Sequence, residues 1–168
     1  MTNTGGNQTQ KGASAAAILA GFDVDPLLAA EMIFRSDDDV WKVVAREIRS
    51  RIQRWHTPGK LDRAVRFMVS TGRSEFIDLL WPLLTHENDQ IHLGALRAAD
   101  RFRPAVFGND AAERLASLPP KVRKHVLSEI ASNSGMEGLD LATAVARADV
   151  DLDVKVAVVT LPPGFHPV

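Results

Sequence analysis

The sequence predicts an all-α fold, built as a right-handed stack of about four antiparallel helix pairs with an irregular N-terminal cap. Apolar segments of the same phase begin at Leu61, Ile91, Val122 and Val154, which are 30, 31 and 32 residues apart. A second apolar segment precedes each of them, and a short stretch containing Gly, Pro, Asp or Asn separates the two. A recurrence of this length is typical of stacked helical repeats, in which each unit buries its apolar face against the next.

The chain divides into a polar tail over residues 1–12, expected to be disordered, and a single helical repeat domain over residues 13–168. Residues 13–35 carry two apolar segments that are interrupted at Asp25 and Pro26. Aspartate followed by proline favours a helix start, because the carboxylate accepts the first free amide hydrogens and proline has none to satisfy. We therefore expect two short helices here, which act as a degenerate first repeat or cap.

Each repeat begins with an apolar first helix, and these helices are expected at residues 40–55, 74–84, 111–118 and 136–148. Turns follow at Pro58 with Gly59, at residues 85–89, at Pro119 with Pro120, and at residues 149–153. Proline, Asp and Asn in these turns favour the start of the second helix. Glycines that can end the second helices stand at Gly72, Gly108, Gly135 and Gly164.

The second helices carry apolar residues at offsets 0, +4 and usually +7 or +8 from their starting positions. Residues at these offsets lie on one stripe of a helix with 3.6 residues per turn, so one face of each helix is expected to be buried. The stripes are Leu61, Val65, Met68 and Val69; Ile91, Ala95, Ala98 and Ala99; Val122, Val126 and Ile130; and Val154, Val158 and Leu161.

The segment FIDLLWPLLTHENDQIHLGALRAADRF resembles a HEAT repeat in its leucine-rich first helix, its Asp/Asn turn and its alanine-rich second helix. The segment DVDLDVKVAVVTL resembles the Asp-x-x-Val-(Arg/Lys) opening of a HEAT second helix, with Asp151, Val154 and Lys155 in the matching places. The likeness covers residues 38–162, and its units are shorter than the about 40 residues of standard HEAT repeats. The chain is therefore more similar to the short variants, and the resemblance implies a HEAT-like α-solenoid that acts as an interaction scaffold.

The composition limits the class of protein. The chain has 168 residues, of which 45% are hydrophobic, enough for one domain with a sizeable core. It has no cysteine, which excludes disulfides, thiolate catalysis and cysteine-ligated zinc. The apolar stretch at residues 15–20 is far shorter than the about 20 residues of a membrane span and makes a poor secretory signal. We expect a cytoplasmic protein, and the ending PPGFHPV leaves open that the chain is part of a longer one.

Charge is segregated along the chain, although the net charge is only −1. Between Lys42 and Arg73 there are nine basic residues and only two acids, Glu47 and Asp62. This basic segment has two interpretations. The cations either lie on ordinary solvent-exposed helix faces, many of them balanced by nearby acids once the chain folds, which is the favoured interpretation, or they begin a strip that attracts anionic partners.

The partner-binding surface is expected on the second helices, whose equivalent positions stack into one ridge. Trp41 and Trp81 lie among aliphatic residues of first helices and are expected to be buried. Trp55 ends the basic first helix and is expected to be an exposed apolar anchor. The cations expected to steer a partner are Lys60, Arg63, Arg66, Arg97, Arg101, Arg123 and Lys124.

No arrangement of residues points to a reaction, so neither catalytic residues nor a cofactor or metal is predicted. The densest polar cluster is His86, Glu87, Asp89 and His92, but its spacing matches no known zinc motif and its place in a turn favours helix capping. We predict a non-catalytic scaffold that binds an acidic or mixed protein partner. The alternatives are non-specific nucleic-acid binding through the basic strip and a regulatory or sensor segment of a larger protein.

Overall fold

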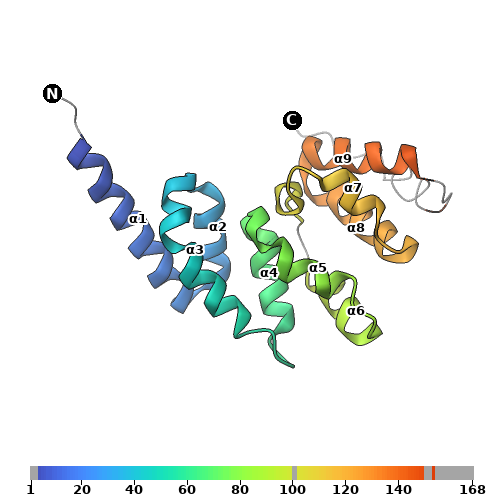
Figure 1. Ribbon diagram of the computed structural model, residues 1–168, viewed down its shortest axis with the longest axis horizontal. Helices are drawn as coiled ribbons and strands as arrows, with labels where there is room; N and C mark the ends of the chain where they lie inside the picture. Colours follow the sequence, from blue (N-terminus) through green and yellow to red (C-terminus); the bar gives the residue numbers. More distant parts are fainter. Residues whose placement is uncertain (1–3, 100–101, 150–152, 154–168) are drawn as a thin grey trace.

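The computed structural model describes residues 4–99, 102–149 and 153. The regular structure of these residues is entirely helical, which confirms the all-α class. Figure 1 shows the helices following one another along the longest axis of the molecule. The elements are α1 (Thr4–Val24), α2 (Pro26–Arg35), α3 (Asp38–Gln53), α4 (Leu61–Thr71), η1 (Ser74–Phe76), α5 (Ile77–Leu84), α6 (Asp89–Ala98), η2 (Pro104–Phe107), α7 (Ala111–Ala116), α8 (Pro120–Asn133) and α9 (Gly135–Ala148), where η marks a 3₁₀ helix.

The expected second helices correspond to α4, α6 and α8, and their predicted stripes face the interior. Leu61 begins α4 and is half-buried, as is Ile91 in α6, whereas Val122 in α8 is only 6% exposed. The later stripe positions, such as Val65 in α4, are buried. The fourth second helix, with Val154, lies outside the described residues.

Local capping explains several of the helix starts. The carboxylate of Asp25 accepts hydrogen bonds from the amides of Leu27 and Leu28 at 3.0 and 3.2 Å, directly before α2. The side chain of Asn88 accepts from the amide of Gln90 at 2.9 Å at the start of α6. Both bonds satisfy first-turn amides that have no partner within the helix, which is why these residues fix the boundaries.

The N-terminal helix corrects one expectation. Helix α1 begins at Thr4, so residues 4–12 are helical where the sequence predicted a disordered tail. Once a helix has been nucleated, each further residue adds a backbone hydrogen bond, so a polar segment can extend a helix whose later turns are packed. Lys11 also forms a 2.5 Å ion pair with Asp39 of α3. The packed turns carry the buried residues Ala15, Ile18 and Phe22.

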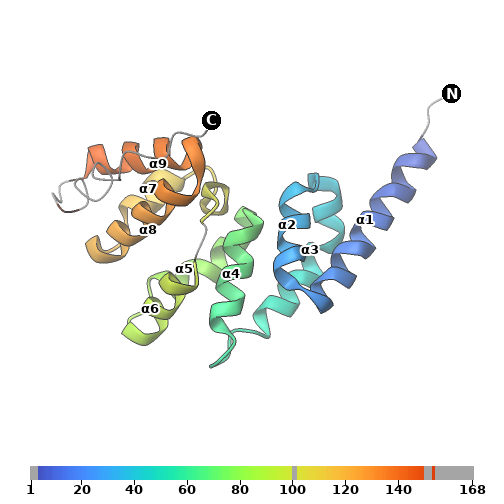
Figure 2. The same ribbon diagram turned by 180° about the vertical axis from the view of Figure 1, so that it is seen from behind.

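The helices pack in two series. Helices α2, α4 and α6 lie side by side in chain order, and α1 packs against both α2 and α3. Towards the C-terminal part, α8 packs chiefly against α9, which also contacts α7. Figures 1 and 2 show this order from opposite sides. As a result, helices close in the sequence are also close in space, and long loops are not needed.

An aromatic cluster joins the N-terminal helices. The ring of Phe67 in α4 meets Phe22 of α1, Phe76 of η1 and Trp55 edge-on, with ring centres 5.1, 6.0 and 6.3 Å apart. Phe22 and Trp55 are stacked at 5.0 Å, and Trp41 of α3 packs against Phe76 at 5.6 Å. Five rings from separate segments therefore form one continuous core, which we call the aromatic cluster.

Gly72 provides a test of the packing at the end of α4, where it lies against neighbouring segments. Its backbone is in the left-handed region, at φ 62°. A Cβ atom there would approach Arg103 Cβ and Phe34 Cδ2 to 3.3 Å each, whereas Gly59, at φ 85°, has open space around it. We expect Gly59→Ala to lower the free energy of unfolding by about 1 kcal/mol through backbone strain, and Gly72→Ala to lower it by more. Urea denaturation of both variants measures the difference, and equal losses would contradict the described contacts.

Candidate functional site

Helix α2 and the second helices carry exposed basic and apolar side chains. Of the cations predicted for partner binding, Lys60, Arg63, Arg66, Arg97 and Lys124 are exposed. Arg101 lies outside the described residues. Exposed apolar side chains accompany the cations, with exposed fractions of 49% for Leu27, 46% for Phe34 and 43% for Leu93. We call the exposed side chains of α2, α4, α6 and α8 the second-helix surface.

A hollow of about 340 Å³ marks the centre of this surface, where α2, α4 and the end of α6 meet. Within it, Arg103 donates to Glu31 at 2.6 Å, and Arg35 donates to the other oxygen of Glu31 at 2.8 Å. The hydrogen bond from Arg103 is the main reason why the pKa of Glu31 lies below its usual range, and the bond from Arg35 acts in the same direction. The carboxylate therefore stays ionised near neutral pH. The lining residues are Leu27, Glu31, Arg66, Val69, Ser70, Ala98 and Arg103.

Arg103 is a residue of this hollow that sequence reasoning missed. Its guanidinium carbon lies 3.4 Å from the ring centre of Phe34, and its Nη1 atom is buried without a hydrogen-bond partner among the described atoms. Glu31, its ion-pair partner, is 72 residues earlier in the chain. No local pattern could have brought these two residues together, because their contact depends on how α2 packs beside α4 and α6.

Trp55 is not the exposed anchor that the sequence predicted. It is half-buried, it stacks on Phe22 at 5.0 Å, and the guanidinium of Arg63 lies 4.4 Å from its ring centre. A ring covered in this way contributes to the core through its buried area and through cation–π attraction. The expectation was wrong because Phe22, which covers one face of the indole, is distant in sequence.

Arg123 is also corrected, since it is only 8% exposed. Its Nη1 donates to the carbonyl oxygens of Ala116 and Leu118 at 2.9 and 2.6 Å, and its Nε lies 2.5 Å from an oxygen of Asp149. Ala116 is the last residue of α7 and Leu118 lies in the turn that follows, so Arg123 caps that helix and ties α8 to the end of α9. It therefore belongs to the interior and cannot steer a partner.

Three arginines of the basic segment pair with acids from other helices, which agrees in part with the favoured interpretation. Arg49 pairs with Asp78 at 2.7 Å and Arg73 with Asp38 at 2.5 Å. Arg51 pairs with Asp23 at 2.6 Å and with Glu47 at 2.7 Å, and its hydrogen bond holds the pKa of Glu47 below the usual range. Four arginines also lie over rings of the aromatic cluster: Arg49 over Phe76, Arg51 over Phe22, Arg63 over Trp55 and Arg73 over Trp41.

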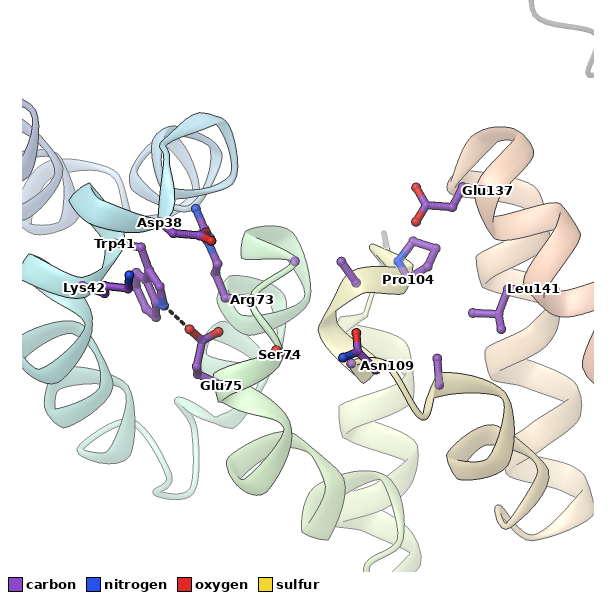
Figure 3. A pocket seen from close by; sticks show the side chains of 14 residues that line it. Asp38, Trp41, Lys42, Arg73, Ser74, Glu75, Pro104, Asn109, Glu137 and Leu141 are labelled. Carbon is purple, nitrogen blue, oxygen red and sulfur yellow. Dashed lines mark hydrogen bonds and ion pairs between the residues drawn. The ribbon is translucent and has the colours of Figure 1, made fainter.

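A separate cleft of about 560 Å³ lies where α3, η1, η2, α7 and α9 approach one another. Figure 3 shows Trp41 and Glu75 on one side of it and Glu137 and Leu141 on the other. The indole of Trp41 is 2% exposed and donates to a carboxylate oxygen of Glu75 at 2.7 Å. The acids of the cleft, Asp38, Glu75 and Glu137, lie in the first turns of α3, η1 and α9. The sequence pattern at these positions indicated the start of a helix but not a cleft.

The polar cluster at the start of α6 serves as a cap. The Nδ1 atom of His86 accepts from the amide of Asn88 at 3.0 Å, and His92 Nδ1 lies 3.7 Å from Asp89. Among the described residues, no group of three or more His, Asp or Glu side chains could hold a metal ion. In the same part of the chain, no helix is long and apolar enough to cross a membrane.

Comparisons with protein-family models, with curated proteins and with solved structures find no match to this chain. The likeness to HEAT repeats therefore depends on the residues quoted for it, and it stays a prediction.

Two adjacent cations of α8 test the division between interior and surface. Arg123→Met should lower the free energy of unfolding by about 3 kcal/mol, because it removes the buried cation that donates to Asp149 and to two carbonyl oxygens. Lys124→Met, on the exposed side of the same helix, should change it by less than about 0.5 kcal/mol. Chemical denaturation measures both variants, and a neutral effect of Arg123→Met would refute its described role.

His56 makes stability depend on pH, because burial lowers the pKa of its imidazole below the ordinary value of about 6.5. A lowered pKa favours the neutral ring in the folded state, so this contribution to stability is present above about pH 6.5 and is lost as the pH falls. His56→Gln should therefore lose less stability than the wild type between about pH 7.5 and about pH 5.5. Urea denaturation at both pH values measures this, with His86→Gln as an exposed control; parallel losses in the wild type and His56→Gln would contradict it.

Proposed function

We propose that this protein is a non-catalytic scaffold, a right-handed HEAT-like α-solenoid that binds a protein partner on its second-helix surface. The observation that carries the proposal is the side-by-side packing of α2, α4 and α6, which gives one surface with exposed apolar and basic side chains around a hollow. Repeat proteins commonly use such extended surfaces to bind partners. The apolar centre would exclude water from the contact while the cations select the sign of the partner's charge.

The partner is expected to be acidic or mixed in charge. Leu27 and Leu93 would contact apolar side chains, and Arg66 and Arg97 would attract carboxylates. Interfaces that combine exposed apolar residues with arginine are typical of protein–protein recognition. Because Arg123 is buried and Arg63 lies over Trp55, the cations that remain for steering are fewer than the sequence predicted.

Nucleic-acid binding is the second candidate, favoured by the exposed cations Lys60, Arg66, Arg97 and Lys124. Two observations weigh against it. The chain has a net charge of −1, and several arginines of the basic segment are paired with carboxylates. Binding to a phosphate backbone gains its free energy mainly from cations that displace counterions, and paired arginines contribute less to this.

Charge reversal on the second-helix surface should strongly reduce the amount of partner protein that is captured. The variant Arg66→Glu/Arg97→Glu, immobilised and exposed to a cell extract, should retain at least about fivefold less of the proteins held by the wild type, because it repels carboxylates. The matched control Arg46→Glu/Arg147→Glu makes the same charge change at exposed positions on α3 and α9. Quantitative mass spectrometry compares the three proteins after circular dichroism has shown that all are folded. Equal recovery from both double variants would defeat this placement of the surface.

Fluorescence anisotropy with a labelled oligonucleotide separates the two candidates. The scaffold proposal expects no binding even at about 50 mM salt, since the net charge is −1 and several arginines of the basic segment are paired with carboxylates. Affinity that is high at about 50 mM salt and falls steeply towards about 200 mM, and that is lost in Arg66→Glu/Arg97→Glu, would favour nucleic acid instead.

A further inference from the structure

A further pocket lies at the turns between paired helices. Its volume is about 440 Å³, and it lies between the end of α5, the start of α6 and the start of α8. It shares no lining residue with the hollow on the second-helix surface or with the cleft of Figure 3. It is lined by Leu84, Thr85, His86, His92, Pro119, Pro120, Lys121 and Val122.

The walls of this turn pocket are mainly apolar and are fixed by the backbone. Leu84 is fully buried at the end of α5, and Val122 is 6% exposed in the first turn of α8. Pro119 precedes α8 and Pro120 is its first residue, and their rings fix the φ angles of this segment. A preformed pocket of this size with apolar walls and few polar groups has the character of a small-molecule site.

The polar groups of the pocket favour an anion. Because His86 Nδ1 accepts the amide hydrogen of Asn88 at 3.0 Å, the neutral ring carries its proton on Nε2 and offers a donor there. His92 also lines the pocket, and its Nδ1 atom lies 3.7 Å from an oxygen of Asp89. Lys121 adds a cation, and none of the described lining residues is acidic.

The start of α8 adds to this polarity. Lys121 and Val122 belong to its first turn, and no described side chain caps that turn. The first amides of a helix carry a partial positive charge, which supports the attraction exerted by Lys121. Apolar walls and donors of positive character thus occur together within one pocket.

We propose that the turn pocket binds an apolar carboxylate, that is, an aromatic or aliphatic group carrying one carboxyl group. The apolar part would lie against Leu84, Val122 and the prolines, and the carboxylate would interact with Lys121 and the imidazoles. This chemistry has two sources, a free organic acid or the carboxyl end of a peptide. The site goes beyond the scaffold function, because its lining residues are separate from those of the hollow on the second-helix surface.

The test is an NMR titration of the full chain, labelled with ¹⁵N, with 3-phenylpropionate and with 3-phenylpropan-1-ol. The acid should shift the amide signals of His86, His92 and Val122 to saturation, and the alcohol should bind about tenfold more weakly because it lacks the charged acceptor. A tripeptide ending in phenylalanine, compared with the same peptide carrying a C-terminal amide, distinguishes the sources. If the free-acid peptide binds more tightly than the amidated peptide, the ligand is the carboxyl end of a peptide. If 3-phenylpropionate binds and neither peptide does, the ligand is a free organic acid.

Two neighbouring lysines of α8 provide a matched control. Lys121→Glu should weaken binding of 3-phenylpropionate by about fivefold or more, whereas Lys124→Glu, which makes the same charge change outside the pocket, should change it by less than about twofold. Signal dispersion in the same spectra shows that each variant is folded. The proposal is overturned if neither acid causes saturable shifts at the pocket, or if the two lysine variants weaken binding equally.

Discussion

The contacts of Phe67 hold the N-terminal part of the molecule together. Its ring touches Phe22, Trp55 and Phe76, which come from α1, the turn after α3, and η1. Buried aromatic side chains remove about 150–250 Å² each from water, and their pair contacts add about 0.5–1.5 kcal/mol. The order in which α1, α3 and α4 pack therefore depends on this cluster more than on any surface contact.

The aromatic cluster also explains where the charges of the basic segment go. Arg51 lies over Phe22 and pairs with Asp23, while Arg73 lies over Trp41 and pairs with Asp38. A guanidinium can do both at once, because its face stacks on a ring while its edge donates to a carboxylate. The density of arginine in this part of the sequence thus reflects the protection of a core that would otherwise be open at its edges.

What this packing leaves exposed sets the possible functions. Helices α2, α4 and α6 expose one mixed surface, the first turns of α3 and α9 face the cleft of Figure 3, and the turns before α6 and α8 enclose a pocket with apolar walls. Each lies on a different part of the stack of helices.

The sequence by itself determined most of the helices, although not the first turns of α1. The apolar period of 3.6, the cap at Asp25, the cap at Asn88 and the left-handed Gly72 all act within a few residues, so they can be read without knowing the fold. The sequence also indicated that acids would balance some of the cations in the basic segment, but it could not show which residues form the ion pairs.

The tertiary structure decided which side chains are covered. The sequence pattern around Trp55 and Arg123 predicts exposure, yet Phe22 covers the first, and Asp149 with the carbonyls of Ala116 and Leu118 holds the second. The hollow at Arg103 and the turn pocket likewise join residues from separate helices. Helix formation is governed by local hydrogen bonds and periodicity, whereas burial is governed by contacts between segments far apart in the chain, and only the packed molecule specifies those contacts.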